Sequence, residues 1–147
     1  MSGRNASKKV ITVEYTNAPP EISARLNLSP DESVFSLKRL MVVDGKPLGI
    51  LHSYIPEKYK LSLGEDYTKS LYRMLEKKGI RLREAKQTIE ASISTPVETR
   101  LMGLKVPFPT LVIRRLAYSV HREIVEDVKG VYHGDRYRYN CRLTRNQ

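Results

Sequence analysis

The chain has 147 residues, 40% hydrophobic and 29% charged, as expected for one soluble globular domain. No apolar run approaches the roughly 20 residues of a membrane-spanning helix, no secretory signal is recognisable, and the single cysteine, Cys141, excludes an internal disulfide, so we expect a cytoplasmic protein. The 26 Lys and Arg exceed the 16 Asp and Glu by ten, and this formal net charge of +10 favours anionic partners.

The beginning of the chain is polar and then turns β-prone. Residues 1–8 are small and polar, so we expect them to be a linker remnant or disordered tail, with the folded domain covering 9–147. The alternation over 10–15 predicts a strand. Pro19 and Pro20 can open a short helix, because proline is tolerated in a first turn.

A hairpin and a helix follow. The β-prone run 34–43, the Asp-Gly pair after it and the run 48–55 predict a β-hairpin. Apolar residues at helical spacing over 67–78 predict a helix that Gly79 ends.

The densest basic cluster is at the end of this predicted helix, with Lys77, Lys78, Arg81 and Arg83. Cations there also complement the helix dipole. The sequence has no zinc-finger spacing, no helix-turn-helix pattern and no basic run interleaved with aromatics. A small anionic ligand is therefore a better prediction than direct DNA binding by this segment.

The second half repeats the alternation of strands and helices. A strand is predicted over 86–94, and Thr95 to Glu98 form a capping box that starts a helix. Another strand is predicted over 110–119, and 123–144 predicts two strands separated by a His-Gly-Asp turn.

A weak internal repeat relates the two halves. Leu28 stands eleven residues before Arg39, and Leu104 stands eleven residues before Arg115. Each pair covers a helix, a turn and a strand with the arginine in its middle, followed by a second strand. Two such units predict an α+β fold, one antiparallel β-sheet with helices on one side.

Strand alternation places three charged side chains on apolar faces: Arg39, Arg115 and Glu126, the last sharing its face with Ile124 and Tyr132. Buried charges need partners. One interpretation is a structural Arg–Glu–Arg cluster within the sheet. The other is a half-buried pocket in which the arginines meet an anionic ligand and Glu126 accepts hydroxyl hydrogen bonds.

The sequence gives no sign of catalysis. The three histidines have no metal-ligand spacing, and nucleophile-elbow, P-loop and dinucleotide motifs do not occur. We therefore expect no catalytic residue, no metal and no cofactor. Ser70, near the start of the predicted helix, could contact a phosphate or cap the helix.

Seven short motifs follow one another along the chain: Lys38-Arg39-Leu40, Asp44-Gly45-Lys46-Pro47, Ser53-Tyr54-Ile55-Pro56, Ser70-Leu71-Tyr72, Ile89-Glu90-Ala91, Pro109 with Leu111 and Arg115, and Tyr132-His133-Gly134-Asp135-Arg136-Tyr137. In this order they resemble a known family, the UTRA domain, which is the effector-binding domain of HutC-type GntR-family bacterial regulators. The resemblance extends over 10–144.

The resemblance implies a chorismate-lyase-like fold, an antiparallel sheet flanked by helices with the ligand between them. It implies a homodimer that binds a small anionic effector, a phosphorylated sugar or an organic acid, and that contacts DNA only through an N-terminal winged-helix domain absent from this chain. By position, Arg39 and Ser70 would contact the phosphate, and Glu126 and Tyr132 the sugar hydroxyls. Arg115 is on the matching strand, where its role could be structural.

Three positions depart from the family pattern. Met41 stands where many members have a second arginine, Leu51 where some have a glutamate, and Val128 where serine is common. These departures indicate a smaller or more apolar effector. Two alternatives to a regulator are a chorismate-lyase-like enzyme and a purely structural dimerisation module.

Overall fold

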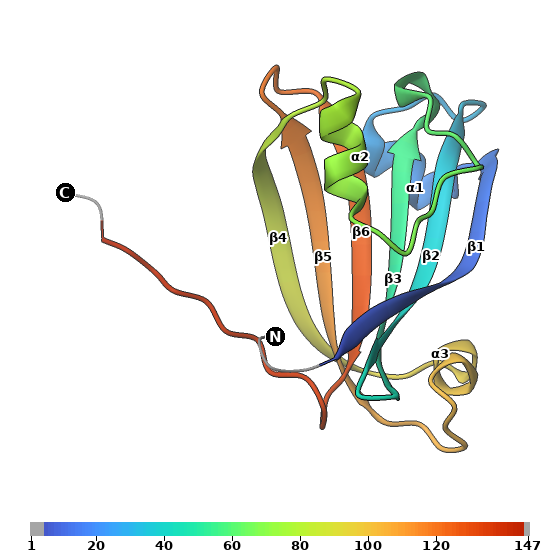
Figure 1. The fold of residues 1–147 in the computed structure, drawn as a ribbon, viewed down its shortest axis with the longest axis vertical. Coiled ribbons are helices and arrows are strands. Elements are labelled where there is room, and N and C mark those ends of the chain that lie inside the picture. The colour runs from blue at the N-terminus through green and yellow to red at the C-terminus, as the bar shows by residue number, and fades with distance from the viewer. Residues whose placement is uncertain (1–4, 146–147) are drawn as a thin grey trace.

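Six antiparallel strands form one open sheet in the order β1-β2-β3-β6-β5-β4 (Figure 1). The strands are β1 (Ala6–Asn17), β2 (Ser33–Val43), β3 (Lys46–Pro56), β4 (Leu82–Ile93), β5 (Pro109–Ser119) and β6 (Ile124–His133). The helices are α1 (Pro20–Leu26), α2 (Leu71–Lys77) and α3 (Pro96–Leu101), with a 3-10 turn, η1, at Glu57–Tyr59. This computed structural model describes residues 5–145. The expected α+β fold with an antiparallel sheet is confirmed.

The sheet consists of two related halves. The units β1-α1-β2-β3 and β4-α3-β5-β6 have the same order of elements, and their last strands pair at the centre of the sheet. Their first strands, β1 and β4, are the two edges, and α2 connects the units. The repeat predicted from Leu28–Arg39 and Leu104–Arg115 therefore corresponds to a real duplication of topology.

Helices cover both faces of the sheet. Figure 1 shows α2 in front of the sheet and α1 behind it. Leu71 and Leu75 of α2 pack in a cluster with Phe35, whereas Ile22 of α1 packs in a cluster with Val34. Phe35 and Val34 are neighbours on β2, so their side chains point to opposite faces. Met102, which follows α3, packs with Ile50 on the face opposite α2. The expectation of helices on one side is therefore correct for α1 and α3 but wrong for α2, because the central strands are apolar on both faces.

The N-terminal segment differs from its prediction. Residues 1–8 were expected to be a linker remnant or disordered tail, but β1 begins at Ala6, which is opposite Val43 of β2. This part of β1 is held by backbone pairing, which requires no apolar side-chain pattern. Residues 1–4 lie outside the described residues.

Three further expectations are corrected. After His133 the chain forms a turn and then an irregular stretch to residue 145, so the second strand predicted over 123–144 is wrong. Helix α2 begins at Leu71, not Tyr67, since Ser70 is its N-cap. A register shift after Ala117 in the β5–β6 pairing puts Ile124 in the α1 cluster, on the opposite face from Glu126.

Within residues 5–145, no helix is long and apolar enough to cross a membrane.

Candidate functional site

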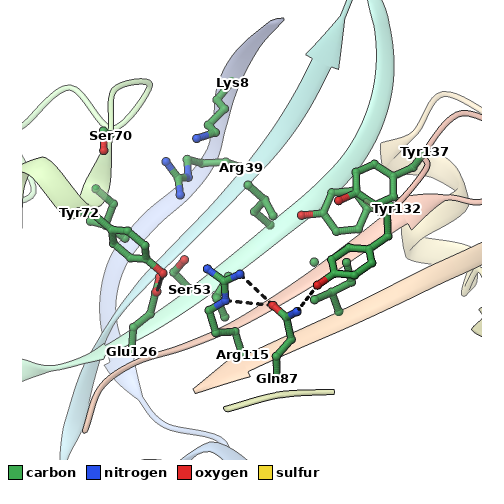
Figure 2. Close-up of a pocket in the computed structure, with 16 residues that line it drawn as sticks. Lys8, Arg39, Ser53, Ser70, Tyr72, Gln87, Arg115, Glu126, Tyr132 and Tyr137 are labelled. Carbon is green, nitrogen blue, oxygen red and sulfur yellow. Dashed lines mark hydrogen bonds between the residues drawn. The ribbon is translucent and has the colours of Figure 1, made fainter. Parts of the chain in front are cut away.

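A cavity of about 280 Å³ lies on the α2 face of the sheet and is called the central cavity here (Figure 2). It is lined by Lys8, Arg39, Leu51, Ser53, Ser70, Leu71, Tyr72, Gln87, Ile113, Arg115, Glu126, Val128, Gly130, Tyr132, Tyr137 and Tyr139. Its floor is aliphatic, because Leu51 and Ile113 are both opposite Gly130 of β6, and Val128 lies two residues from Gly130 on the same strand. Polar side chains surround this floor.

All five residues predicted from the sequence line this cavity: Arg39, Ser70, Arg115, Glu126 and Tyr132. Three strands and the loop before α2 supply them, so they meet only in the folded sheet. Strand alternation placed the charged ones correctly because the period of two is kept through the middle of β2 and β5.

Arg39 is buried, and only some of its hydrogen-bond donors have an acceptor within residues 5–145. Its side chain is 5% exposed, and its Nη1 donates to the backbone oxygen of Tyr67 over 3.3 Å. Its Nε has no hydrogen-bond partner among the described residues. A buried guanidinium with an unused donor is costly unless another group completes its hydrogen bonding.

Lys8 extends from the start of β1 toward Arg39, and Figure 2 shows the two side chains next to each other. Burial, together with the nearby charge of Arg39, lowers the pKa of Lys8. Among residues 5–145, neither cation forms an ion pair with a carboxylate. This end of the cavity is therefore strongly cationic. Sequence reasoning missed Lys8, because its segment was assigned to the tail.

Glu126 lies further along the cavity and is 2% exposed. The hydroxyl of Tyr72 donates to its Oε1 over 2.8 Å. Burial raises the pKa of Glu126, although the Tyr72 hydrogen bond and the charges of Arg39 and Arg115 act in the opposite direction. No ion pair joins Glu126 to either arginine in the described part of the chain. A closed Arg–Glu–Arg cluster is thus not formed, and Glu126 is available as an acceptor.

Arg115 is held by the edge strand. Its Nε and Nη2 donate to Oε1 of Gln87 on β4 over 3.1 and 2.8 Å. The Nε2 of Gln87 donates to the hydroxyl of Tyr139 over 3.1 Å. Neither Gln87 nor Tyr139 was predicted, because the β4–β5 register and the path of the C-terminal tail cannot be read from local pattern.

Tyr132 lies flat against the backbone of two glycines. A Cβ atom at Gly130 would be 2.6 Å from the Tyr132 ring, and one at Gly49 would be 2.8 Å from it. On its other side the ring stacks on Tyr137, with centroids 4.1 Å apart and an interplanar angle of 19°. Burial raises the pKa of Tyr132 to about 12. The two glycines thus create the space that lets an aromatic wall border the cavity.

Ser70 caps α2, since its side chain accepts a hydrogen bond from the backbone N–H of Arg73 over 3.4 Å. The cap predicted as one alternative is therefore present, and the same side chain also borders the cavity. Of the three departures from the family pattern, Leu51 and Val128 form the cavity floor, and Met41 lines an adjoining hollow.

The described residues contain no group of three or more His, Cys, Asp and Glu side chains that could hold a metal ion.

The central cavity is lined by cations, one carboxyl group, hydroxyls and aliphatic surface. It is suited to holding a small organic anion through charge-assisted hydrogen bonds.

The family model and the similar proteins found by comparison agree with each other. The family model described as "UTRA domain" matches residues 1–138. The HTH-type transcriptional repressor NagR of Bacillus subtilis is 28% identical over 139 residues, which are 93% of this chain and 57% of that protein. The repressor PhnF of Mycolicibacterium smegmatis is 23% identical, covering 95% of this chain and 58% of the relative. The chain thus spans less than three-fifths of these two relatives.

Solved structures agree in fold. The crystal structure of PhnF from Mycobacterium smegmatis has a TM-score of 0.91 at 21% identity, with 98% of this chain and 65% of that chain covered. The C-terminal domain of the histidine utilization repressor from Pseudomonas syringae has a TM-score of 0.87 at 23% identity, with 96% of this chain and all of that chain covered. These relatives are transcriptional repressors and not enzymes.

Proposed function

The chain belongs to the UTRA domain family, and we propose that it binds a small anionic effector in the central cavity as the sensor part of a transcriptional regulator. The observation that carries the proposal is the pair of cations at one end of the cavity, Lys8 and Arg39, neither of which forms an ion pair within residues 5–145. Two like charges this close disfavour one another, and a bound phosphate or carboxylate would reverse that effect.

The other end of the cavity supports a ligand that carries hydroxyl groups. Glu126 can accept from a hydroxyl, Tyr72 lies beside it, and Gln87 lines the same cavity next to Arg115. We propose that Arg39, Lys8 and Ser70 bind the anionic group, while Glu126, Tyr132 and Arg115 contact the remainder of the effector. A phosphorylated sugar or a hydroxylated organic acid has this combination of groups.

Our further proposals concern DNA binding by a longer regulator that would contain this chain. We propose that a winged-helix domain outside this chain binds operator DNA, and that effector binding in the central cavity changes the affinity of that domain for DNA. We propose that the regulator acts in the cytoplasm. We also propose a homodimer, because β1 and β4 are the sheet edges and neither has a second strand partner within residues 5–145. Light scattering on the purified chain would test this, and a monomer at tens of micromolar would contradict it.

A thermal-shift screen tests the sensor proposal. The chain would be heated with phosphorylated sugars and organic acids, alongside the variants Arg39→Ala and Arg100→Ala. Arg100 is exposed on α3 and serves as the matched control. A ligand at a hundred times its dissociation constant adds about 2.7 kcal/mol of stability, which raises Tm by several degrees. We expect Arg39→Ala to abolish that rise and Arg100→Ala to keep it. A rise that survives Arg39→Ala would refute the proposed anion site.

A further inference from the structure

A second space adjoins the central cavity. This outer hollow of about 450 Å³ is bordered by Ser7 at the start of β1, Met41 of β2 and Thr68 in the loop before α2. Lys8, Tyr132 and Tyr137 line it as well, and these three residues also line the central cavity. The two spaces are therefore neighbours that share these three side chains as part of their walls.

The boundary between the two spaces coincides with the cationic end of the central cavity. Lys8 lines both, and Arg39, whose charge acts on Lys8, lines the central cavity. An anionic group held by these two cations would have the aliphatic floor and Glu126 on one side. On the other side it would face the outer hollow.

The walls of the outer hollow differ in chemistry from those of the central cavity. Met41 contributes a flexible thioether side chain, and Tyr132 and Tyr137 contribute a stacked aromatic pair. Among the described residues that line it, none is Asp or Glu, and Lys8 is the one charged residue. Thioether and aromatic surfaces together favour flat apolar groups, because sulfur and ring edges both make good contacts with an aromatic ring.

We propose that the outer hollow is a second subsite, which takes an apolar, preferably aromatic, substituent of the anionic effector. The inference rests on the proposed function in one respect, that the anion is held beside Lys8 and Arg39. It adds that the effector class is an organic phosphate or carboxylate with an apolar group next to the charge. Such a ligand would contact the first residues of β1 and the C-terminal tail at the same time.

Paired probes test the subsite. The ¹⁵N-labelled 147-residue chain would be titrated with phenyl phosphate and, separately, with methyl phosphate, and the amide shifts recorded by NMR. We expect phenyl phosphate to bind about tenfold more tightly, the ratio that corresponds to about 1.4 kcal/mol. We also expect it alone to shift the amides of Ser7, Met41 and Thr68.

Variants separate the two proposals. Met41→Ser should bring the affinity ratio of the two phosphates close to one while leaving the affinity for methyl phosphate unchanged. Ile93→Ser, at a 61% exposed position at the end of β4, should keep the tenfold ratio. Equal affinities in the unmodified chain, or a ratio that survives Met41→Ser, would overturn the second subsite and leave the anion site standing. Failure of both phosphates to bind would overturn the anion site itself.

Discussion

Arg39 and Arg115 occupy equivalent positions in the two halves of the sheet but have different neighbours. Arg115 on β5 is opposite Gln87 of the edge strand β4, and the amide oxygen of Gln87 accepts two of its hydrogen bonds. Arg39 on β2 is opposite Val10 of the edge strand β1, which offers no side-chain acceptor. Arg115 is therefore held by the fold, whereas the buried Nε of Arg39 has no hydrogen-bond partner in the described part of the chain.

This difference predicts opposite effects on the stability of the ligand-free chain. Arg39→Met should raise the free energy of unfolding by about 1 kcal/mol, because it removes an incompletely paired buried charge. Arg115→Met should lower it by about 1 kcal/mol, because Gln87 loses its donors. Urea unfolding of both variants would measure the changes. A loss of stability in Arg39→Met as large as that in Arg115→Met would contradict this account.

The hydrogen bond from Tyr72 to Glu126 predicts a cost for removing one hydroxyl. Tyr72→Phe should lower the free energy of unfolding by about 1–2 kcal/mol, since the buried carboxyl group loses its donor. Tyr118→Phe is the control, because Tyr118 is also partly buried but its side-chain contact within residues 5–145 is made by the ring, under Lys86, which the substitution keeps. Equal effects of the two substitutions in urea unfolding would argue against a stabilising role for the bond.

The close approach of Tyr132 to Gly130 predicts that a single methyl group disturbs the cavity wall. Gly130→Ala should lower the free energy of unfolding by about 1–3 kcal/mol, because the added Cβ overlaps the ring and displaces it. At Gly64 a Cβ would be 3.6 Å from its nearest neighbour, so Gly64→Ala should be nearly neutral. Denaturation curves and the near-ultraviolet dichroism of the tyrosines would report both effects. An unchanged spectrum in Gly130→Ala would mean that the ring position is not fixed by this glycine.

His52 predicts a dependence of stability on pH. Burial, followed by the charge of Lys38, lowers the pKa of His52 from 6.5 to about 4. The unfolded chain therefore binds a proton at His52 more tightly than the folded chain does. The contribution of neutral His52 to the free energy of unfolding is fully present above pH 6.5 and is lost as the pH falls toward 4. The full shift would correspond to about 3 kcal/mol, and partial solvent exposure reduces the expected loss to about 1 kcal/mol.

Two variants measure the contribution of His52. His52→Gln should flatten the decrease in Tm between pH 6.5 and 4, whereas His121→Gln, at an exposed position, should leave it unchanged. If both variants follow the unmodified chain over this range, the acid sensitivity comes from other groups.

The sequence predicted the parts of the fold that depend on local pattern. The β2–β3 hairpin follows from the Asp44-Gly45 turn, where both residues have a positive φ, and α3 follows from its Thr95–Glu98 capping box. The faces of Arg39 and Arg115 followed from strand alternation. Ile124 was placed on the wrong face because a register shift interrupts the alternation.

The parts of the site that were missed depend on contacts between distant segments. Lys8 is on a polar stretch whose strand conformation comes from pairing with β2, and Tyr137 is positioned by stacking on Tyr132. Gln87 meets Arg115 only in the observed register of β4 and β5. None of these three relationships leaves a periodic signal in the sequence.

The most direct test of the anion site is a calorimetric titration with the strongest ligand from the thermal-shift screen. The unmodified chain, Arg39→Ala and Lys8→Ala would be compared at the same salt concentration. We predict that Arg39→Ala weakens binding about a hundredfold, equivalent to about 2.7 kcal/mol, and that Lys8→Ala weakens it about tenfold, as expected for loss of a charge-assisted hydrogen bond. Unchanged affinity in both variants would show that the ligand binds elsewhere and that the central cavity is not the effector site.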